Sequence, residues 1–154
     1  MWFKVNIVNR MIKVVKIEAF LLPTPPYTPV ISCHLEDGRQ FNLYYVPYEV
    51  VIAINRVQGE DYDVDRESLF DILPMITSEF KDALKGRVRA VYVDYLNKET
   101  MLYTATMEIS VDGAIIRKRM IPSHAIYLAL IIGSEIYVAD ELIRHQEEIT
   151  RRHR

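Results

Sequence analysis

The chain has 154 residues, of which 50% are hydrophobic and 26% are charged, and its net charge is −2. This balance excludes a disordered chain and a strongly basic protein that would attract phosphate backbones along its whole surface. The longest apolar run, from Ala125 to Ile132, is far shorter than the roughly 18 residues that a bilayer crossing needs.

One cysteine, Cys33, cannot form a disulfide within the chain and is predicted to be a small buried side chain in a strand. The first ten residues have no pattern of a secretory signal, so a cytoplasmic protein without membrane contact is expected. Isoleucine and tyrosine are abundant and glutamine is rare, which is compatible with a thermophilic source.

The first half is predicted to form three strands and a helix. A proline-rich loop follows the first strand, and Gly38 permits a hairpin turn between the second and third because it takes a positive φ without steric cost. Pro47 is predicted to occupy the first turn of the helix. The expected strands cover residues 11–22, 30–35 and 40–45, and the expected helix covers 48–56.

A polar, acidic loop over residues 59–65 leads into the middle of the chain. Asp65 has the chemistry of a helix N-cap, so a helix over residues 66–84 is expected to begin there. Pro74 lies inside this helix and is expected to kink it or to split it after Leu73.

The second half repeats the order of three strands and a helix, then adds a strand and a last helix. The first of these strands should place Arg89, Val91, Val93 and Tyr95 on one face, because side chains alternate along a strand. The predicted fold class is α+β, a single domain whose mixed, mostly antiparallel sheets come from two β-β-β-α units. The expected strands cover 87–95, 101–110, 114–121 and 135–138, and the expected helices cover 122–132 and 140–152.

Two segments of the second half resemble the signature of the bifunctional nuclease domain family, which reads roughly RPSDAIALAL and PIYVAEEVL. They are residues 121–130, IPSHAIYLAL, and 136–142, IYVADEL. Residues 44–54, YYVPYEVVIAI, look like the family's WIGPFEAQAIA. The resemblance divides the chain into an N-terminal extension over 1–10, a nuclease-like domain over 11–142, and a helix end with a basic tail over 143–154.

The resemblance implies cleavage of RNA and DNA phosphodiesters, assisted by Mg²⁺ or Mn²⁺. This sequence matches the family at Glu49 and Ser123 but has His124 in place of an aspartate and Glu67-Ser68 in place of a His-Asp pair. Apolar and turn positions follow the pattern more closely than chargeable ones. A non-catalytic scaffold or nucleic-acid-binding module that kept the fold is therefore the alternative.

Glu49, Glu67 and His124 are the candidate catalytic residues, because such a nuclease needs carboxylates or histidines gathered near the scissile phosphate. If the two halves pack face to face, Glu49 and His124 should fall close together at the starts of equivalent helices. The alternative is that they merely favour first helical turns, as glutamate does through the helix dipole. Ser123 is a candidate binding residue, and the ligand set for a metal stays open.

Arg117 and Arg119 share one face of a strand and are candidate binding residues for phosphate groups. Arg87 and Arg89 on another strand could extend them into a basic strip. The alternative is an ordinary solvated sheet face with charge pairs between strands.

A two-fold homodimer is also predicted, because the last helix carries apolar Leu142, Ile143 and Ile149 and a meander leaves sheet edges to cover. The competing interpretation is a monomer in which this helix folds back over its own sheet. The ordered fold is expected to begin at Met11, since residues 1–10 add nothing to the family-like pattern.

Overall fold

The structure is a computed structural model that describes residues 10–154, so the predicted N-terminal extension lies outside the described residues except for Arg10. Within this range, seven strands form one sheet in the order β3-β2-β1-β7-β4-β5-β6. The strands are β1 (Met11–Leu21), β2 (Pro29–Leu35), β3 (Gln40–Tyr44), β4 (Val88–Asn97), β5 (Leu102–Val111), β6 (Ala114–Met120) and β7 (Glu135–Ala139). The helices are α1 (Tyr48–Val57), α2 (Leu69–Thr77), the short 3-10 helix η1 (Ser78–Phe80), α3 (Lys81–Lys85), α4 (Pro122–Ile132) and α5 (Asp140–Arg152). The α+β class and the single domain are confirmed.

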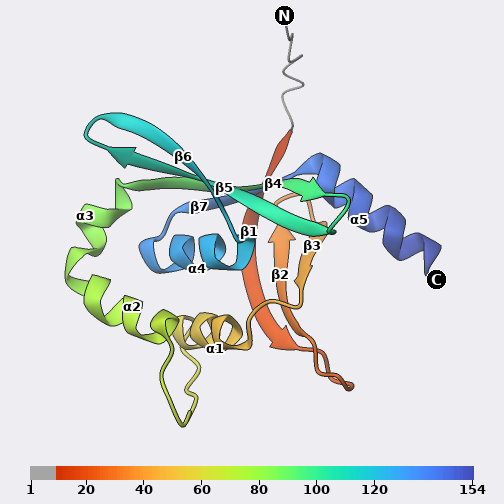
Figure 1. The fold of residues 1–154 in the computed structure, drawn as a ribbon, viewed down its shortest axis with the longest axis horizontal. Helices are drawn as coiled ribbons and strands as arrows, with labels where there is room; N and C mark the ends of the chain where they lie inside the picture. Colours follow the sequence, from red (N-terminus) through yellow and green to blue (C-terminus); the bar gives the residue numbers. More distant parts are fainter. Residues whose placement is uncertain (1–9) are drawn as a thin grey trace, which may run out of the picture.

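Each half contributes one antiparallel meander, β1-β2-β3 and β4-β5-β6, as predicted. The two meanders do not form separate sheets, because β7 joins them by pairing antiparallel with β1 and parallel with β4. Figure 1 shows the two meanders running across each other, so the joined sheet bends strongly. The bend brings Phe41 of β3 within reach of Tyr103 of β5, with ring centroids 5.1 Å apart in an edge-to-face arrangement.

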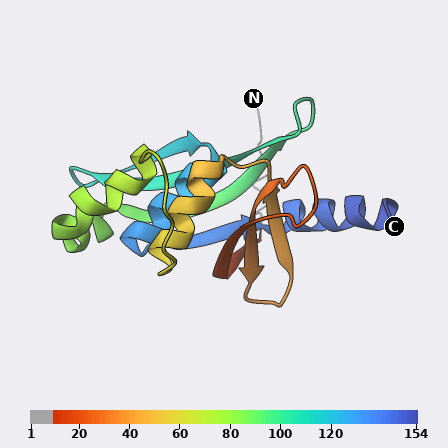
Figure 2. The same cartoon turned by 90° about the horizontal axis from the view of Figure 1, so that it is seen from below.

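Helices α1 to α4 lie on one face of the sheet (Figures 1 and 2). Helix α4 is apolar on all sides and sits in the middle of the core, between the sheet and α1. The opposite face of strands β7, β4, β5 and β6, called the open face below, has none of these four helices over it. None of the helices in the described part of the chain combines the length and the apolar character that a membrane crossing requires.

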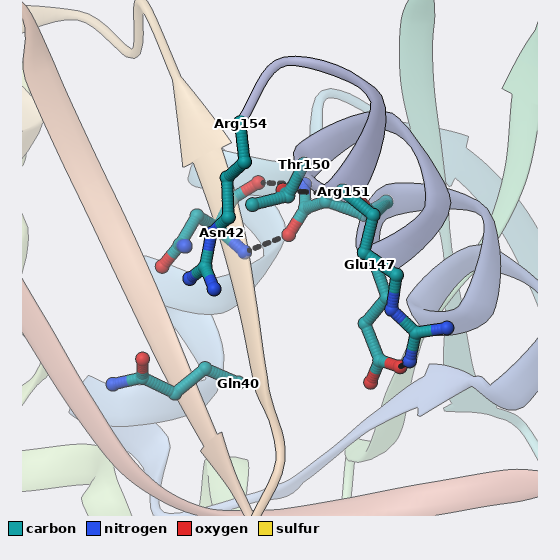
Figure 3. A pocket seen from close by; sticks show the side chains of 7 residues that line it. Gln40, Asn42, Glu147, Thr150, Arg151 and Arg154 are labelled. Carbon is teal, nitrogen blue, oxygen red and sulfur yellow. Dashed lines mark hydrogen bonds and ion pairs between the residues drawn. The ribbon is translucent and has the colours of Figure 1, made fainter.

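Helix α5 closes the outer edge of β3. The Gln146 side chain accepts a hydrogen bond from the Asn42 N–H and donates one to the Asn42 carbonyl, both at 2.8 Å, as a neighbouring strand would (Figure 3). Leu142 and Ile143 of α5 are buried in their own chain, at 6% and 0% exposure. The last helix therefore packs against its own chain through these two residues, and they are not free to form a dimer contact.

The predicted helix over residues 66–84 is wrong in its start, and it does not split after Leu73. Helix α2 begins at Leu69, and its N-cap is Ser68 rather than Asp65. The Ser68 N–H donates a hydrogen bond to Asp71 Oδ2 at 2.9 Å. Pro74 does not end α2, although it has no N–H for the carbonyl four residues earlier, that of Phe70. The Tyr127 hydroxyl donates to this carbonyl instead, and α2 continues to Thr77.

The predicted alternation along β4 is also wrong. Val91 and Val93 are fully buried, but Arg89 and Tyr95 are exposed. The register shifts between Val88 and Ala90 and again between Val93 and Tyr95, and each β-bulge inserts one residue. The bulges thus turn Arg89 and Tyr95 away from the core.

Candidate functional site

Two of the three predicted catalytic residues, Glu49 and Glu67, line one hollow of about 570 Å³. Glu49 lies in the first turn of α1, and Glu67 lies directly before the N-cap of α2. This acidic hollow is bordered by three more carboxylates, those of Asp63, Asp65 and Asp71.

Arg56 of α1 neutralises part of the acidic hollow. Its Nη1 lies 2.7 Å from Glu67 Oε2 and 2.8 Å from Asp71 Oδ1, and its Nη2 donates to the Tyr62 carbonyl at 2.6 Å. The hydrogen bond to Glu67 is the main reason why the pKa of Arg56 is raised, against the opposing effect of burial. Glu67 is therefore the partner of a fixed cation, and this arrangement ties the 60–68 loop to α1.

His124 and Ser123 lie in the first turn of α4, and within the described residues neither is bonded to Glu49 or Glu67. The His124 ring faces the Phe70 ring of α2, with centroids 5.0 Å apart. Among residues 10–154, no hydrogen bond or ion pair joins His124 to Glu49 or Glu67. Ser123 is 2% exposed, and its hydroxyl has no hydrogen-bond partner there. The structure thus brings Glu49 and Glu67 together and places His124 against α2.

The carboxylates of the acidic hollow are not arranged as ligands for the Mg²⁺ or Mn²⁺ ion that the sequence resemblance implies. Glu67 and Asp71 are already bound to Arg56, and Asp71 also accepts bonds from the N–H and hydroxyl of Ser68. In the described part of the chain, no group of three histidine, cysteine or acidic side chains is arranged to hold a metal ion. We therefore derive no metal-dependent step at this hollow.

A second candidate surface crosses the open face. Residues at matching register positions on five neighbouring strands form a line of side chains, called the tyrosine row. Its members, in order across β1, β7, β4, β5 and β6, are Lys13, Tyr137, Tyr92, Thr106 and Arg119. The rings of Tyr92 and Tyr137 are stacked, with centroids 5.3 Å apart and an interplanar angle of 18°.

Arg117 and Arg119, the predicted phosphate-binding residues, both project from this face. Arg119 lies over the Tyr95 ring, with its guanidinium carbon 4.8 Å from the centroid. Arg117 is highly exposed and lies 3.8 Å from Glu108 on the neighbouring strand. Lys13 pairs with Glu135 at 3.2 Å. The open face therefore mixes cations with acidic partners, and its cations are exposed enough to exchange those partners for phosphates.

Burial and acidic neighbours raise the pKa of both tyrosines of the row above the ordinary value of about 10, so the rings stay neutral over a wider pH range. Burial, followed by a hydrogen bond to Glu108, raises the pKa of Tyr92. The hydrogen bond to Glu135, followed by burial, raises the pKa of Tyr137 to about 12. Next to the row, burial raises the pKa of Asp94, although its carboxylate accepts a 2.9 Å hydrogen bond from Thr106. Neutral rings beside cations are suited to nucleobases and phosphates.

Sequence reasoning missed Tyr92 and Tyr137 as functional candidates. The pair exists only because β7 inserts beside β4 in parallel, which joins residues far apart in the sequence. The one available signal was the alternation of Glu135 and Tyr137 with buried apolar residues, which marks them as outward-facing.

No family model matches the chain, and no curated protein matches it either. Two surfaces of the domain, the acidic hollow and the open face, are therefore the candidate sites.

Proposed function

We propose that this domain is a cytoplasmic module that binds single-stranded nucleic acid on its open face. The observation that carries the proposal is the stacked pair Tyr92 and Tyr137, which lies in a row that begins with Lys13 and ends with Arg119. Unpaired bases present flat surfaces that stack on such rings whatever their sequence, and cations at both ends can neutralise the phosphates that follow.

The alternative of hydrolysis has weaker geometric support. Catalysis needs a free base or a set of free donor atoms near the phosphate, but Glu67 is bound to Arg56 and His124 lies against Phe70. The open face, in contrast, requires no rearrangement of buried groups before a base can approach.

The test is fluorescence anisotropy with labelled single-stranded RNA and DNA oligonucleotides at several salt concentrations. The double variant Tyr92→Ala/Tyr137→Ala should weaken binding at least tenfold, because each stacked base contributes about 1–3 kcal/mol and about 1.4 kcal/mol equals a factor of ten. Tyr44→Ala is the matched control, since Tyr44 is also exposed but lies on β3. Undetectable binding at low salt, or equal losses in both variants, would contradict the proposal.

The cations are tested separately by salt dependence. Arg117→Ala and Arg119→Ala should each lower the slope of log K against log salt by about 0.7 if each contacts one phosphate of a single strand. Lys85→Ala, which removes a cation from α3 on the helix-covered side, should leave the slope unchanged. A slope that stays the same in all three variants would show that the open face does not carry the phosphates.

The second candidate function, hydrolysis of RNA or DNA, is favoured by one observation, the shared hollow of Glu49 and Glu67. The same oligonucleotides are incubated with the protein, with and without Mg²⁺ or Mn²⁺. Cleavage that disappears in Glu49→Ala and in Glu67→Ala, while binding persists, would favour a nuclease over a binding module. Intact oligonucleotides under all conditions would leave binding as the function.

A further inference from the structure

Helix α2 and the residues after it carry an apolar stripe that faces away from the protein. Its members are three or four residues apart or adjacent, which places them on one side of a helix. They are exposed by 67%, 40%, 72%, 60% and 59%, in the order Leu69, Ile72, Met75, Ile76 and Phe80. None of the nine residues of α2 is buried. Contiguous apolar exposure of this kind marks an interaction surface.

The other side of the same segment is already occupied by the domain. Phe70 contacts the rings of Tyr127 and His124, and Leu73 and Leu84 pack against the core. Figure 1 shows α2 and α3 at the margin of the molecule, far from α5. The stripe is therefore unpartnered within residues 10–154, and it is distinct from the open face on the other side of the sheet.

We infer that the stripe binds the same stripe of a second copy of this chain, with the two α2 helices antiparallel across a two-fold axis. Charge complementarity favours this occupant. Residues 60–67, before α2, carry five carboxylates and one arginine, whereas residues 79–87, at the end of the stripe and after it, carry Lys81, Lys85 and Arg87 against Glu79 and Asp82. An antiparallel pair brings the lysine end of each copy to the acidic end of the other, as a self-complementary two-fold interface requires.

Two other occupants fit less well. An anionic membrane surface would be repelled by the acidic loop next to Leu69. Glu79 and Asp82 lie among the lysines, which also weakens attraction to anionic lipid but leaves a mixed-charge border that suits a protein surface.

Pairing of two copies through the sheet edge is also disfavoured. Strand β6 is an edge of the sheet, but Arg117, Lys118 and Arg119 occupy its second half. Two β6 strands side by side would bring these cations together, which is one way in which proteins protect an edge from association.

Sedimentation equilibrium at micromolar concentration tests the inference. The unchanged protein should have twice the 18.0 kDa mass of one chain. Met75→Glu should reduce the mass to that of one chain without changing the far-ultraviolet circular dichroism, because Met75 is the most exposed residue of the stripe. Val15→Glu is the matched control, since Val15 is 62% exposed on β1, and it should stay dimeric. A monomer at every concentration, or a dimer that persists in Met75→Glu, would overturn the inference.

Charge reversal tests the antiparallel arrangement. Asp65→Lys and Lys85→Glu should each weaken the dimer about tenfold or more, and the double variant should recover most of the loss because the opposite charges are restored. Losses that add in the double variant would contradict the antiparallel pairing. Met75→Glu, Asp65→Lys and Lys85→Glu lie outside the open face and should bind oligonucleotides as the unchanged protein does, so the result is independent of the proposed function.

Discussion

Helices α4 and α2 have nearly the same mean hydropathy but opposite environments. Eight of the eleven residues of α4 are buried, whereas α2 buries none of its nine. The two helices contact each other through Tyr127, which stands edge-on to Phe70 and donates to the Phe70 carbonyl. Two helices of nearly equal mean hydropathy can thus be the centre of a core or a layer outside it, and their partners decide which.

The two helices are stabilised by different sets of contacts. Helix α4 is held on all sides by the sheet and α1, and it ends in a left-handed Gly133. Helix α2 is held along one side only, at its N-cap by Ser68 and Asp71 and in its first turn by Tyr127, which bonds the Phe70 carbonyl. The comparison predicts that changes in α4 unfold the domain, whereas changes in α2 release that helix or its partner.

The largest difference in stability is expected when a glutamate is introduced into each of the two helices. Ile126→Glu places a carboxylate at a position with 0% exposure, and an unpaired buried charge costs several kcal/mol, a large part of the roughly 5–15 kcal/mol that stabilises a domain. Met75→Glu should change the free energy of unfolding of the monomer by less than about 0.5 kcal/mol. Urea unfolding followed by circular dichroism measures both. Similar losses in the two variants would show that α2 is as integral to the core as α4.

A smaller loss of stability is expected when the hydrogen bond between α4 and α2 is removed. Burial raises the pKa of Tyr127 to about 12, so its hydroxyl is protonated and serves as the donor that Pro74 cannot supply to Phe70. Tyr127→Phe should cost about 1–2 kcal/mol, since it leaves a partly buried carbonyl without a donor. Amide hydrogen exchange should accelerate in α2 more than in α4. Tyr127→Phe combined with Pro74→Ala should recover part of the loss, because the substituted alanine restores a backbone N–H.

A smaller effect is expected at the N-cap of α2. Ser68→Ala removes a hydroxyl that donates to Asp71 Oδ2 at 2.9 Å and should cost about 1 kcal/mol or less, mainly as fraying of the first turn. Ser78→Ala is the matched control, because the Ser78 hydroxyl is exposed and bonds the Met75 carbonyl at the other end of α2. Hydrogen exchange of the Asp71 and Ile72 amides measures the difference. Equal protection in the two variants would show that the Ser68 hydroxyl does not anchor the helix.

The same comparison explains which parts of the fold were predictable from the sequence. The elements around α4 carry local signals, such as Pro122 at its start and Gly133 at its end, and the predicted bounds of α4 agree with the structure. The start of α2 was mispredicted because Asp65 satisfies the single-residue rule for an N-cap, whereas Ser68 and Asp71 satisfy a reciprocal one. Its continuation past Pro74 depends on Tyr127, 57 residues from Phe70, which no local pattern reveals.

The candidate site also combines residues that the local sequence predicts with contacts that it does not. Glu49 and Glu67 were predicted from helix starts, and both line the acidic hollow. The bond from Arg56 to Glu67 and the stacked Tyr92 and Tyr137 arise from loop closure and from the parallel pairing of β7 with β4. Sequence patterns predict which residues begin a helix or face outward, but the partner of each side chain depends on distant segments.

Acid should loosen α2 through Asp71. Burial alone would raise the pKa of Asp71, but hydrogen bonds from Ser68 and Arg56 outweigh it, so the pKa lies below the ordinary value of about 3.9. A carboxylate with a lowered pKa adds stability that is complete above its unfolded value and is lost as the pH falls through the folded one. The difference in unfolding free energy between the unchanged protein and Asp71→Asn should therefore be constant from pH 7 to about pH 5 and shrink below about pH 4. Urea unfolding of both proteins across this range measures it. A difference that persists at the lowest pH, or that grows as the pH falls, would show that the ionised Asp71 does not hold α2 against α1.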